Sequence, residues 1–529
     1  MNGNSILLIG FYNTKALGVR YLEKSLKMAG YEVCTLFLKE FNSVQPEALD
    51  DNELLLLKTV VNITKPALIG LSVMSSLYLE TVIAVNEFLH AHFTVPVVWG
   101  GVYPTLFPER SLAYADYVLR GEGEEAIIEL ADAVIQSKSE YSREQLNRST
   151  AIPYQNIRNL AFKTNGSIVQ NELRPLNKNL DSLGHPLFTN DNKFFIDQGK
   201  LTQGDPMLKS VSYELSASRG CPFVCSYCSS VNLKRIYKNA GGYVRFRGVS
   251  GVINELVSAR TAMKSLKVIH FWDEIFPDDR EWIDDFAQQY KNKISLPFEI
   301  WGHPLRTDDY TIARLTGAGL YKVVMGIQSG SPSIRKDIFH RTEKQEDILE
   351  AGKVLSRHKV PQIVYDFMLR HPFEKEEDIR QTYELCTRLA KPFELQLHGL
   401  SFLPGTDIVG IAIAQGILDR KQAEAVLYGP MQQQYNIYWG QENQNVMMDF
   451  WYSLIYLTQF KTGLILSRYL SHFNESSFHR NIALKLPKIY APAAKFHYLY
   501  QKVRLLIKAV LSQSGRSRKS GNVLDIARQ

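Results

Sequence analysis

The chain has 529 residues, of which 45% are hydrophobic and 22% charged, and its formal net charge is +7. A chain of this length is too long to fold around one hydrophobic core, so several domains are expected. The composition is that of a folded chain. The charge is mild and lies mostly near the end of the sequence, which argues against a broad basic face for nucleic acid.

Five cysteines are too few for a disulfide scaffold, and the N-terminus has no basic segment or cleavage site of an export signal. No run approaches the roughly 20 apolar residues of a membrane span. The sequence therefore predicts a cytoplasmic protein.

Short apolar runs alternate with helical patterns over residues 1–150. Strands are predicted at 5–10, 32–38, 66–73, 95–100 and 117–119, with helices at 18–29 and 80–92 between them. Such alternation indicates a parallel, doubly wound, Rossmann-like sheet, whose ligands lie beyond the carboxyl ends of the strands. Glycines occupy those ends, at Gly10, Gly100, Gly101 and Gly121.

Residues 151–205 change character. Two short strand-like runs flank Thr164-Asn165-Gly166, a strong hairpin signal, and a linker rich in Asn, Asp and Leu follows. We interpret this part as a hairpin and connector. Strand–helix alternation resumes over 206–410 and predicts an open or partial barrel of six strand–helix units, (β/α)6, with an α/β fold overall. Residues 411–529 are expected to be helical and to end in a basic tail.

The six candidate strands of the partial barrel lie at 211–217, 268–272, 298–301, 321–326, 362–369 and 395–402.

Three cysteines, Cys221, Cys225 and Cys228, lie within eight residues directly after a predicted strand. Thiolates hold iron–sulfur clusters, and three thiolates on a four-iron cube leave one iron open. The alternative is structural zinc, which usually takes four ligands in two pairs. The sequence holds no second Cys or His pair of that kind, so a zinc ion would have to borrow a distant histidine.

The Cys-x₃-Cys-x₂-Cys spacing, with Tyr227 before the last cysteine, resembles the signature of the radical S-adenosylmethionine (SAM) superfamily. The resemblance implies one [4Fe-4S] cluster, whose open iron chelates SAM and cleaves it to a 5′-deoxyadenosyl radical. It also implies an external electron donor of the flavodoxin or ferredoxin type, and a place for Tyr227 in the SAM site.

Two later strand ends resemble the same superfamily. Asp273 and Glu274 match an acidic pair that lies near the amino end of SAM, with the N-cap of a helix as the alternative. Gln328 and Ser329 match the strand end that contacts the SAM ribose, although Gln328 stands where many members have Glu.

The order Gly100-Gly101-Val102-Tyr103 and then Gly121-Glu122-Gly123-Glu124-Glu125, ahead of the hairpin and cysteine loop, resembles a cobalamin-binding domain fused to such barrels. The resemblance implies that Gly100, Gly101 and Tyr103 contact cobalamin. No Asp-x-His-x-x-Gly occurs, so no histidine for the lower face of cobalt is evident. Tyr103 could lie beneath the cobalt or simply pack there. The alternative is a Rossmann-like domain with another ligand or none.

The family resemblance implies methyl transfer to an unactivated carbon. One SAM would methylate the cobalamin, and a substrate radical made with a second SAM would take the methyl group. Oxidation, ring formation or rearrangement with the same cofactors is the alternative. A non-catalytic cobalamin sensor is disfavoured, because a sensor has no use for an open iron.

The sequence leaves the substrate open among a small molecule, a peptide and a lipid. The tail at 495–511 is basic and amphipathic, and peripheral contact with an anionic membrane through it would favour a lipid. A solvated helix is the alternative for this tail. Arg370 and His371 depart from a family strand motif, and their roles stay open.

Overall fold

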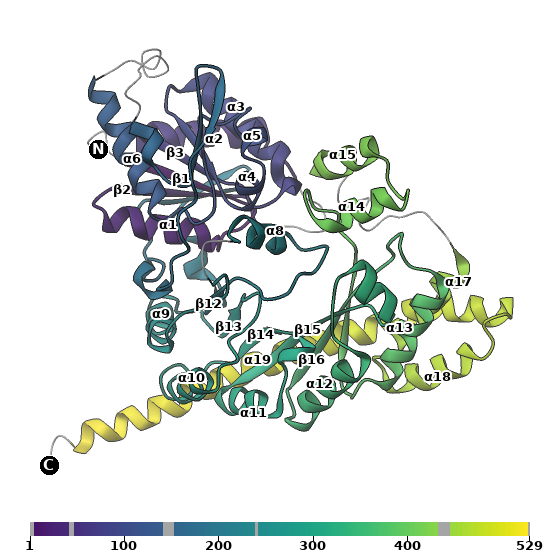
Figure 1. Cartoon of the computed structure of the whole chain (residues 1–529). Helices are drawn as coiled ribbons and strands as arrows, with labels where there is room; N and C mark the ends of the chain where they lie inside the picture. Colours follow the sequence, from purple (N-terminus) through teal and green to yellow (C-terminus); the bar gives the residue numbers. More distant parts are fainter. Residues whose placement is uncertain (1–4, 42–46, 141–152, 239–241, 432–444, 527–529) are drawn as a thin grey trace.

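The computed structural model describes residues 5–41, 47–140, 153–238, 242–431 and 445–526. Two α/β domains lie one above the other, and helices near the C-terminus lie beside both (Figure 1). The predicted α/β class, with a doubly wound domain, a parallel-stranded barrel domain and a helical C-terminal region, is confirmed.

The N-terminal domain is built on a nine-stranded sheet in the order β7-β6-β5-β4-β3-β1-β2-β8-β9. Its central strands are parallel and carry the predicted runs. The strands are β1 (Ser5–Phe11), β2 (Glu32–Leu38), β3 (Leu68–Ser72), β4 (Val97–Gly100), β5 (Tyr117–Leu119), β6 (Leu160–Thr164), β7 (Ser167–Gln170), β8 (Lys193–Asp197) and β9 (Lys200–Gln203). The helices are α1 (Leu17–Met28), α2 (Asp51–Thr64), α3 (Leu79–His92), α4 (Val102–Leu106), α5 (Pro108–Ser111) and α6 (Ala126–Glu140).

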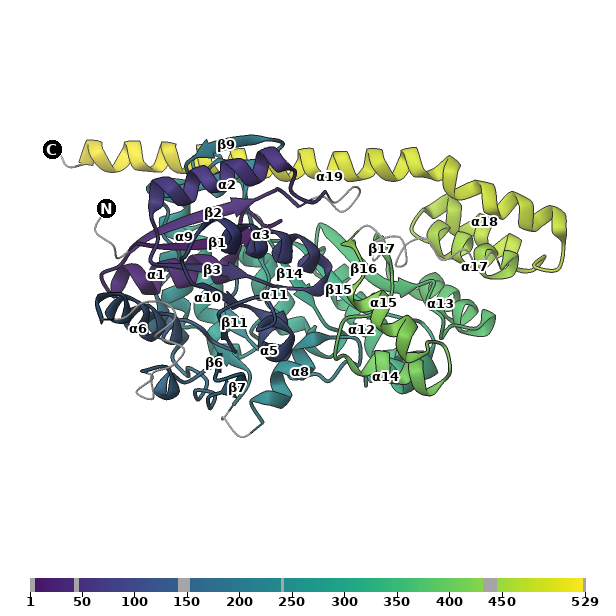
Figure 2. The ribbon, with the colours of Figure 1, turned by 90° about the horizontal axis from the view of Figure 1, so that it is seen from above.

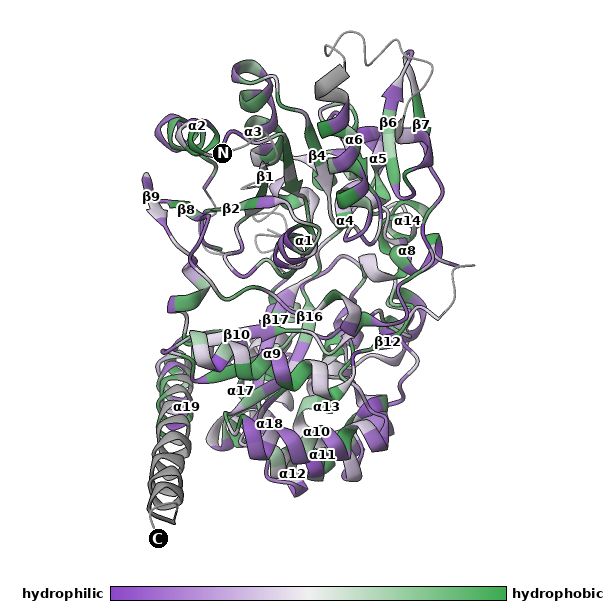
Figure 3. Cartoon of the chain, turned by 90° about the vertical axis from the view of Figure 1, so that its left-hand side faces the viewer, coloured by the Kyte–Doolittle hydropathy of each residue, from purple (hydrophilic) through white to green (hydrophobic). Residues whose placement is uncertain are grey.

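Helices cover both faces of this sheet because alternate residues of a strand point to opposite sides. In β1, Leu7 and Ile9 join a core that includes side chains of α2 and α3. Ile6 and Leu8 join a second core formed with α1 and α6. The continuous apolar run of β1 is thus buried on both sides, as expected for a central parallel strand. Figure 3 shows β1 in the green of hydrophobic residues.

Residues 153–205 extend the sheet at both edges. The predicted hairpin at Thr164-Asn165-Gly166 is confirmed as β6–β7, and Asn165 and Gly166 have the positive φ angles of a tight two-residue turn. The segment interpreted as a connector also forms a second hairpin, β8–β9, that pairs with β2 at the opposite edge. The domain boundary placed after residue 150 stays a prediction.

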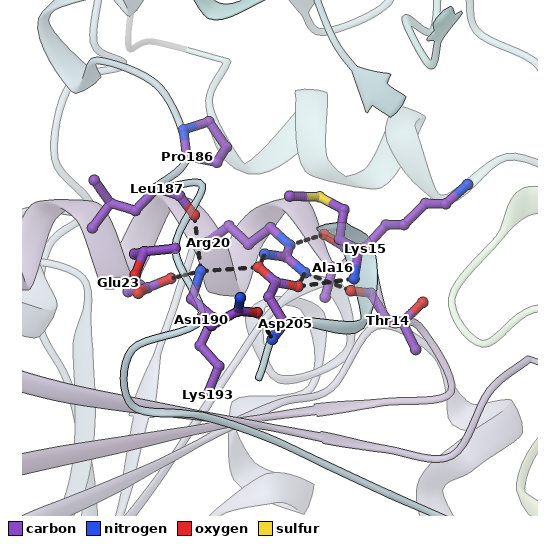
Figure 4. A network of polar contacts seen from close by, with 12 residues as sticks. Thr14, Lys15, Ala16, Arg20, Glu23, Pro186, Leu187, Asn190, Lys193 and Asp205 are labelled. Atoms are coloured by element: carbon purple, nitrogen blue, oxygen red, sulfur yellow. Dashed lines mark hydrogen bonds and ion pairs between the residues drawn. The ribbon is translucent and has the colours of Figure 1, made fainter. Parts of the chain in front are cut away.

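A buried set of ion pairs ties α1 to β8 and the connector (Figure 4). Arg20 donates to both carboxylate oxygens of Asp205, at 2.6 and 2.8 Å. Lys193 Nζ lies 3.0 Å from Asp205 and 3.2 Å from Glu23. Arg20 also donates to the main-chain carbonyls at 14–15, so these paired charges fix the loop between β1 and α1.

The second domain has six parallel strands in sequence order: β10 (Ser212–Leu215), β13 (Val268–Phe271), β14 (Phe298–Gly302), β15 (Leu320–Gln328), β16 (Gln362–Leu369) and β17 (Glu394–Gly399). Its helices are α9 (Val249–Ala262), α10 (Arg280–Lys293), α11 (Asp309–Ala318), α12 (Gln345–Arg357) and α13 (Glu376–Arg388). Figure 3 shows much of the ribbon of α10, α11 and α12 in the purple of hydrophilic residues. A small ladder, β11 (Ser218–Arg219) with β12 (Arg245–Phe246), brackets the cysteine loop and α8 (Ser229–Ile236).

The C-terminal region contains α14 (Asp407–Ala414), α15 (Arg420–Tyr428), α17 (Val446–Leu457), α18 (Lys461–Ser471) and α19 (Ser477–Ile526). Helix α17 packs on α13 and sends Phe450, Trp451 and Leu454 into the barrel core. Helix α15 instead contacts the N-terminal domain, where Arg110 pairs with Glu424. No helix in the described part of the chain has both the length and the apolar character that a bilayer-spanning segment needs.

Candidate active site

A cavity of about 470 Å³ lies between the two domains. The N-terminal sheet lines it with loops at the carboxyl ends of its strands, as predicted for this fold. The glycines on this side are Gly18, Gly70, Gly100, Gly101, Gly121 and Gly123. The barrel side includes Ser218, Arg219, Gly220, Trp272 and Glu274. The glycine edge and the start of the cysteine loop therefore border one space.

The glycine edge leaves room for a broad ligand. A Cβ atom at Gly18 or at Gly100 would meet no other atom within 4 Å. Gly101 has φ +116°, and a Cβ there would lie 2.7 Å from the Val73 carbonyl oxygen, so the chain can make this turn only with glycine. These positions fit a flat cofactor that lies close to the main chain.

Tyr103 lies outside the residues that line the cavity. It is buried, with its ring centroid 5.3 Å from Phe107 and 6.5 Å from Tyr428 of α15. The Tyr103 ring packs between the N-terminal domain and α15. Its contact with cobalamin stays a prediction.

The three cysteines lie on one loop between β11 and α8, and each is unpaired and partly exposed. Burial, with smaller contributions from neighbouring groups, raises the pKa of Cys221 to about 12 and that of Cys228 to about 11. These thiols are therefore protonated until a metal displaces the protons. Within the described ranges, no three or more His, Cys, Asp or Glu side chains are arranged to hold a single metal ion. Three thiols on a short loop fit the donor chemistry of a [4Fe-4S] cluster.

Arg341 supports this loop from behind. Its Nη1 donates to the Tyr227 hydroxyl at 3.1 Å, its Nη2 donates to the Gly326 carbonyl at 2.8 Å, and its Nε pairs with buried Glu343. One guanidinium thus joins the cysteine loop to the end of β15. Arg341 could not be predicted from the sequence, because a single arginine outside the motifs carries no signal until the fold buries it beside them.

The acidic pair follows β13. Asp273 is buried and accepts a hydrogen bond from the Ser218 hydroxyl, and burial raises its pKa to about 7. Its Oδ2 has no hydrogen-bond partner within the described residues. Glu274 lines the cavity and accepts hydrogen bonds from Ser230 of α8 at 2.8 and 2.9 Å. The N-cap of the following helix, α10, is Asp279. Helix capping therefore does not explain the acidic pair Asp273 and Glu274.

Gln328 ends β15 in the left-handed region, with φ +69°. Its Nε2 lies 3.4 Å from Asp366, while its buried Oε1 finds no hydrogen-bond partner in the part of the chain that the structure describes. A buried acceptor of this kind suits a ligand hydroxyl. Ser329 is fully buried, and its hydroxyl accepts a hydrogen bond from the Ser331 main chain, which supports the turn.

The Gly121–Glu125 run also joins the domains. Glu122 lies 3.0 Å from Arg219 and 2.9 Å from Arg245, and Glu124 lies 2.6 Å from Arg219. Burial alone would raise the pKa of Glu122, but the two arginines hold it below its usual value. Arg219 precedes Cys221 by two residues, so these ion pairs fix the cysteine loop against the N-terminal domain. This contact could not be predicted from the sequence, because the partners lie about 100 residues apart.

Residues 11–131 match the B12 binding domain family, and residues 215–386 match the Radical SAM superfamily. The chain is a cobalamin-binding radical SAM enzyme. The two matched segments supply most of the residues that line the cavity, one segment from each side. The predicted family and its cofactors, a [4Fe-4S] cluster, SAM and cobalamin, are confirmed at the level of these domains.

Relatives share this architecture. An uncharacterized methyltransferase, PH0819 of Pyrococcus horikoshii, is 25% identical over 67% of this chain and 71% of its own. The anaerobic magnesium-protoporphyrin IX monomethyl ester cyclase of Cereibacter sphaeroides is 22% identical over 55% of this chain and 44% of its own. Two solved structures have a similar fold. The radical SAM methyltransferase TsrM of Kitasatospora setae superposes with a TM-score of 0.58 at 17% sequence identity. The match covers 78% of this chain and 76% of TsrM. The cobalamin-dependent SAM radical enzyme OxsB superposes with a TM-score of 0.60 at 13% sequence identity. The match covers 100% of this chain and 82% of OxsB.

In this radical SAM enzyme, Arg370 and His371 lie away from the cavity lining. Arg370 pairs with Asp449 of α17 at 3.0 Å, and its guanidinium carbon lies 4.9 Å from the ring centroid of Tyr452. His371 is buried against Phe339, and burial lowers its pKa to about 3. The departure from the family motif therefore coincides with a contact to the C-terminal helices.

Proposed function

We propose that this enzyme is a cobalamin-dependent methyltransferase that adds a methyl group to an unactivated carbon of its substrate. The observation that carries the proposal is the cavity that the glycine edge and the start of the cysteine loop both border. When bound, the cluster supplies electrons for SAM cleavage and cobalamin supplies the methyl group. The methyltransferase names of PH0819 and TsrM support this reaction over the alternatives.

The residues take separate roles in this proposal. The three cysteines of the loop would hold the cluster. Asp273 and Glu274 would receive the amino end of SAM, because carboxylates at this strand end complement an ammonium group. Gln328 would hydrogen-bond the ribose through its unpartnered Oε1. The remaining predicted contacts are those of Tyr227 and Ser329 with SAM and of Gly100, Gly101 and Tyr103 with cobalamin.

The cavity walls would control access of water. Trp272 lies on the barrel side of the cavity, with its ring centroid 5.5 Å from that of Trp301. Leu17, Val98 and Leu119 line the opposite side. These apolar side chains would keep water from their part of the cavity and so protect a reactive carbon radical from side reactions.

Two partners complete the proposal. An external electron donor of the flavodoxin or ferredoxin type would reduce the cluster, and the substrate would be a small molecule, a peptide or a lipid. The C-terminal tail would make the peripheral membrane contact predicted from its sequence.

The test is methyl labelling. Anaerobic enzyme with cobalamin, reductant and SAM labelled in its methyl group is incubated with a small-molecule extract, and labelled products and 5′-deoxyadenosine are measured. We expect both to be lost in Cys225→Ala and kept in Cys386→Ala, which removes a buried thiol of α13. Formation of 5′-deoxyadenosine with a product that lacks the label would contradict methyl transfer.

A further inference from the structure

Helix α19 carries the net positive charge of the protein. Residues 477–526 contain ten lysines and arginines and a single acidic residue, Asp525, a net charge of +9. The whole chain has a net charge of +7, so the rest of the protein is slightly acidic. Figure 2 shows α19, in yellow, extending along one side of the molecule to its C-terminal end. The excess of basic over acidic residues thus lies on one long helix.

One face of α19 is apolar and exposed to solvent. Between residues 489 and 507, six large apolar side chains of this helix have exposed fractions between 45% and 72%. They are Ile489, Phe496, Leu499, Tyr500, Val503 and Ile507. At about 100° per residue they fall within a stripe about 100° wide. We call these six residues the apolar stripe.

A different face of α19 holds the helix against the barrel. Ala483 and Leu486 are buried in the barrel core. Farther along, the Tyr321 hydroxyl of β15 donates to the main-chain carbonyl of Gln501 at 2.7 Å. His497 lies 3.3 Å from Glu394 at the start of β17. These contacts fix the rotation of the helix, so the apolar stripe faces outward.

Basic side chains border the stripe. Lys488 and Lys495 are exposed and fall on one border, and exposed Arg504 falls on the other. Lysine and arginine can lay their aliphatic stems beside an apolar surface while their charged ends reach anionic groups. An apolar strip between basic borders is the pattern of a helix that lies in the plane of a membrane interface.

We propose that the apolar stripe of α19 docks on an anionic lipid surface. The charge of the helix decides between this occupant and a second copy of the chain. Two copies that met through the stripe would bring two helices of charge +9 together, whereas anionic headgroups neutralise that charge. The inference rests on the peripheral membrane contact proposed above, and it does not depend on methyl transfer.

The experiment uses the full-length chain and vesicles of phosphatidylcholine with or without phosphatidylserine. We expect co-sedimentation with the phosphatidylserine vesicles, little with pure phosphatidylcholine, and weakening by salt. The triple variant F496S/L499S/V503S should lose about tenfold or more in vesicle affinity, because each substitution removes an apolar side chain from the bilayer contact. The matched control is L55S/I63S, which replaces exposed apolar residues of α2.

Three outcomes would overturn the inference: wild-type protein that stays in the supernatant, equal vesicle binding by the triple variant, or a dimer in solution that the triple variant dissolves. Cleavage of SAM without vesicles is measured alongside, and we expect the triple variant to retain it. If the triple variant loses vesicle binding but still cleaves SAM, the substitutions have affected only the apolar stripe. If the wild-type enzyme binds vesicles but methyl labelling fails, only the proposed reaction is contradicted.

Discussion

Gly121 gives the most direct test of how the two domains meet. This residue follows β5, lines the cavity and has φ +74°. A Cβ atom there would overlap the Tyr237 hydroxyl and lie 2.8 Å from the Tyr237 Cζ. A left-handed conformation costs a residue with a Cβ about 1–2 kcal/mol, and displacing Tyr237 loses the hydrogen bond from the Glu122 main chain, about 1 kcal/mol. Gly121→Ala should therefore lower the free energy of unfolding by about 2–3 kcal/mol.

Gly123 is the matched control, because it lines the same cavity and a Cβ there would meet only Leu22 Cδ2 at 3.5 Å. Gly123→Ala should change stability by less than about 0.5 kcal/mol. Denaturant unfolding followed by fluorescence measures stability, and titration with hydroxocobalamin followed by absorbance measures cofactor affinity. We expect weaker cobalamin binding in G121A and partial recovery of stability in G121A/Y237A, which removes the overlap. Equal behaviour of G121A and G123A would refute the reasoning.

Two further predictions concern buried charges. Arg341→Met leaves buried Glu343 without its ion pair, so we expect a loss of about 3–5 kcal/mol in stability and a lower iron content after reconstitution. Arg341→Lys should recover part of both, and an iron content unchanged in R341M would contradict support of the loop by Arg341. Burial raises the pKa of Glu374 to about 8, above its ordinary value of 4.5. Because the folded pKa is the higher one, the stability that this group contributes is complete below pH 4.5 and is lost as the pH rises to 8. Glu374→Gln should therefore flatten the decline in unfolding free energy between pH 5 and pH 8.5, and an unchanged slope would contradict this role.

Local patterns predicted most of the fold. The alternating apolar runs located the central strands of both sheets, because a buried parallel strand is recorded in a few consecutive residues. The hairpin at Asn165-Gly166 was visible for the same reason. The second hairpin, β8–β9, was not, because Lys193 and Asp205 are charged residues whose burial depends on Arg20, far away in the chain.

The site was predictable where its residues are close in sequence. The spacing of the cysteines located their loop, and the resemblance to superfamily motifs put Asp273 and Gln328 at strand ends, while their contacts with SAM stay predictions. The contacts of Arg341 with Tyr227 and of Glu122 with Arg219 join residues about 100 positions apart, and only folding reveals them. The packing of Tyr103 on α15 likewise depends on a helix more than 300 residues later.

The measurement that tests the central claim most directly is metal analysis of the full-length enzyme purified without oxygen from cells supplied with cobalamin. We predict about four irons and one cobalt per chain, and in Cys225→Ala the loss of iron with cobalt retained. Zinc without iron in the wild-type enzyme, or iron without cobalt, would contradict the assignment of two cofactors to the two sides of the cavity.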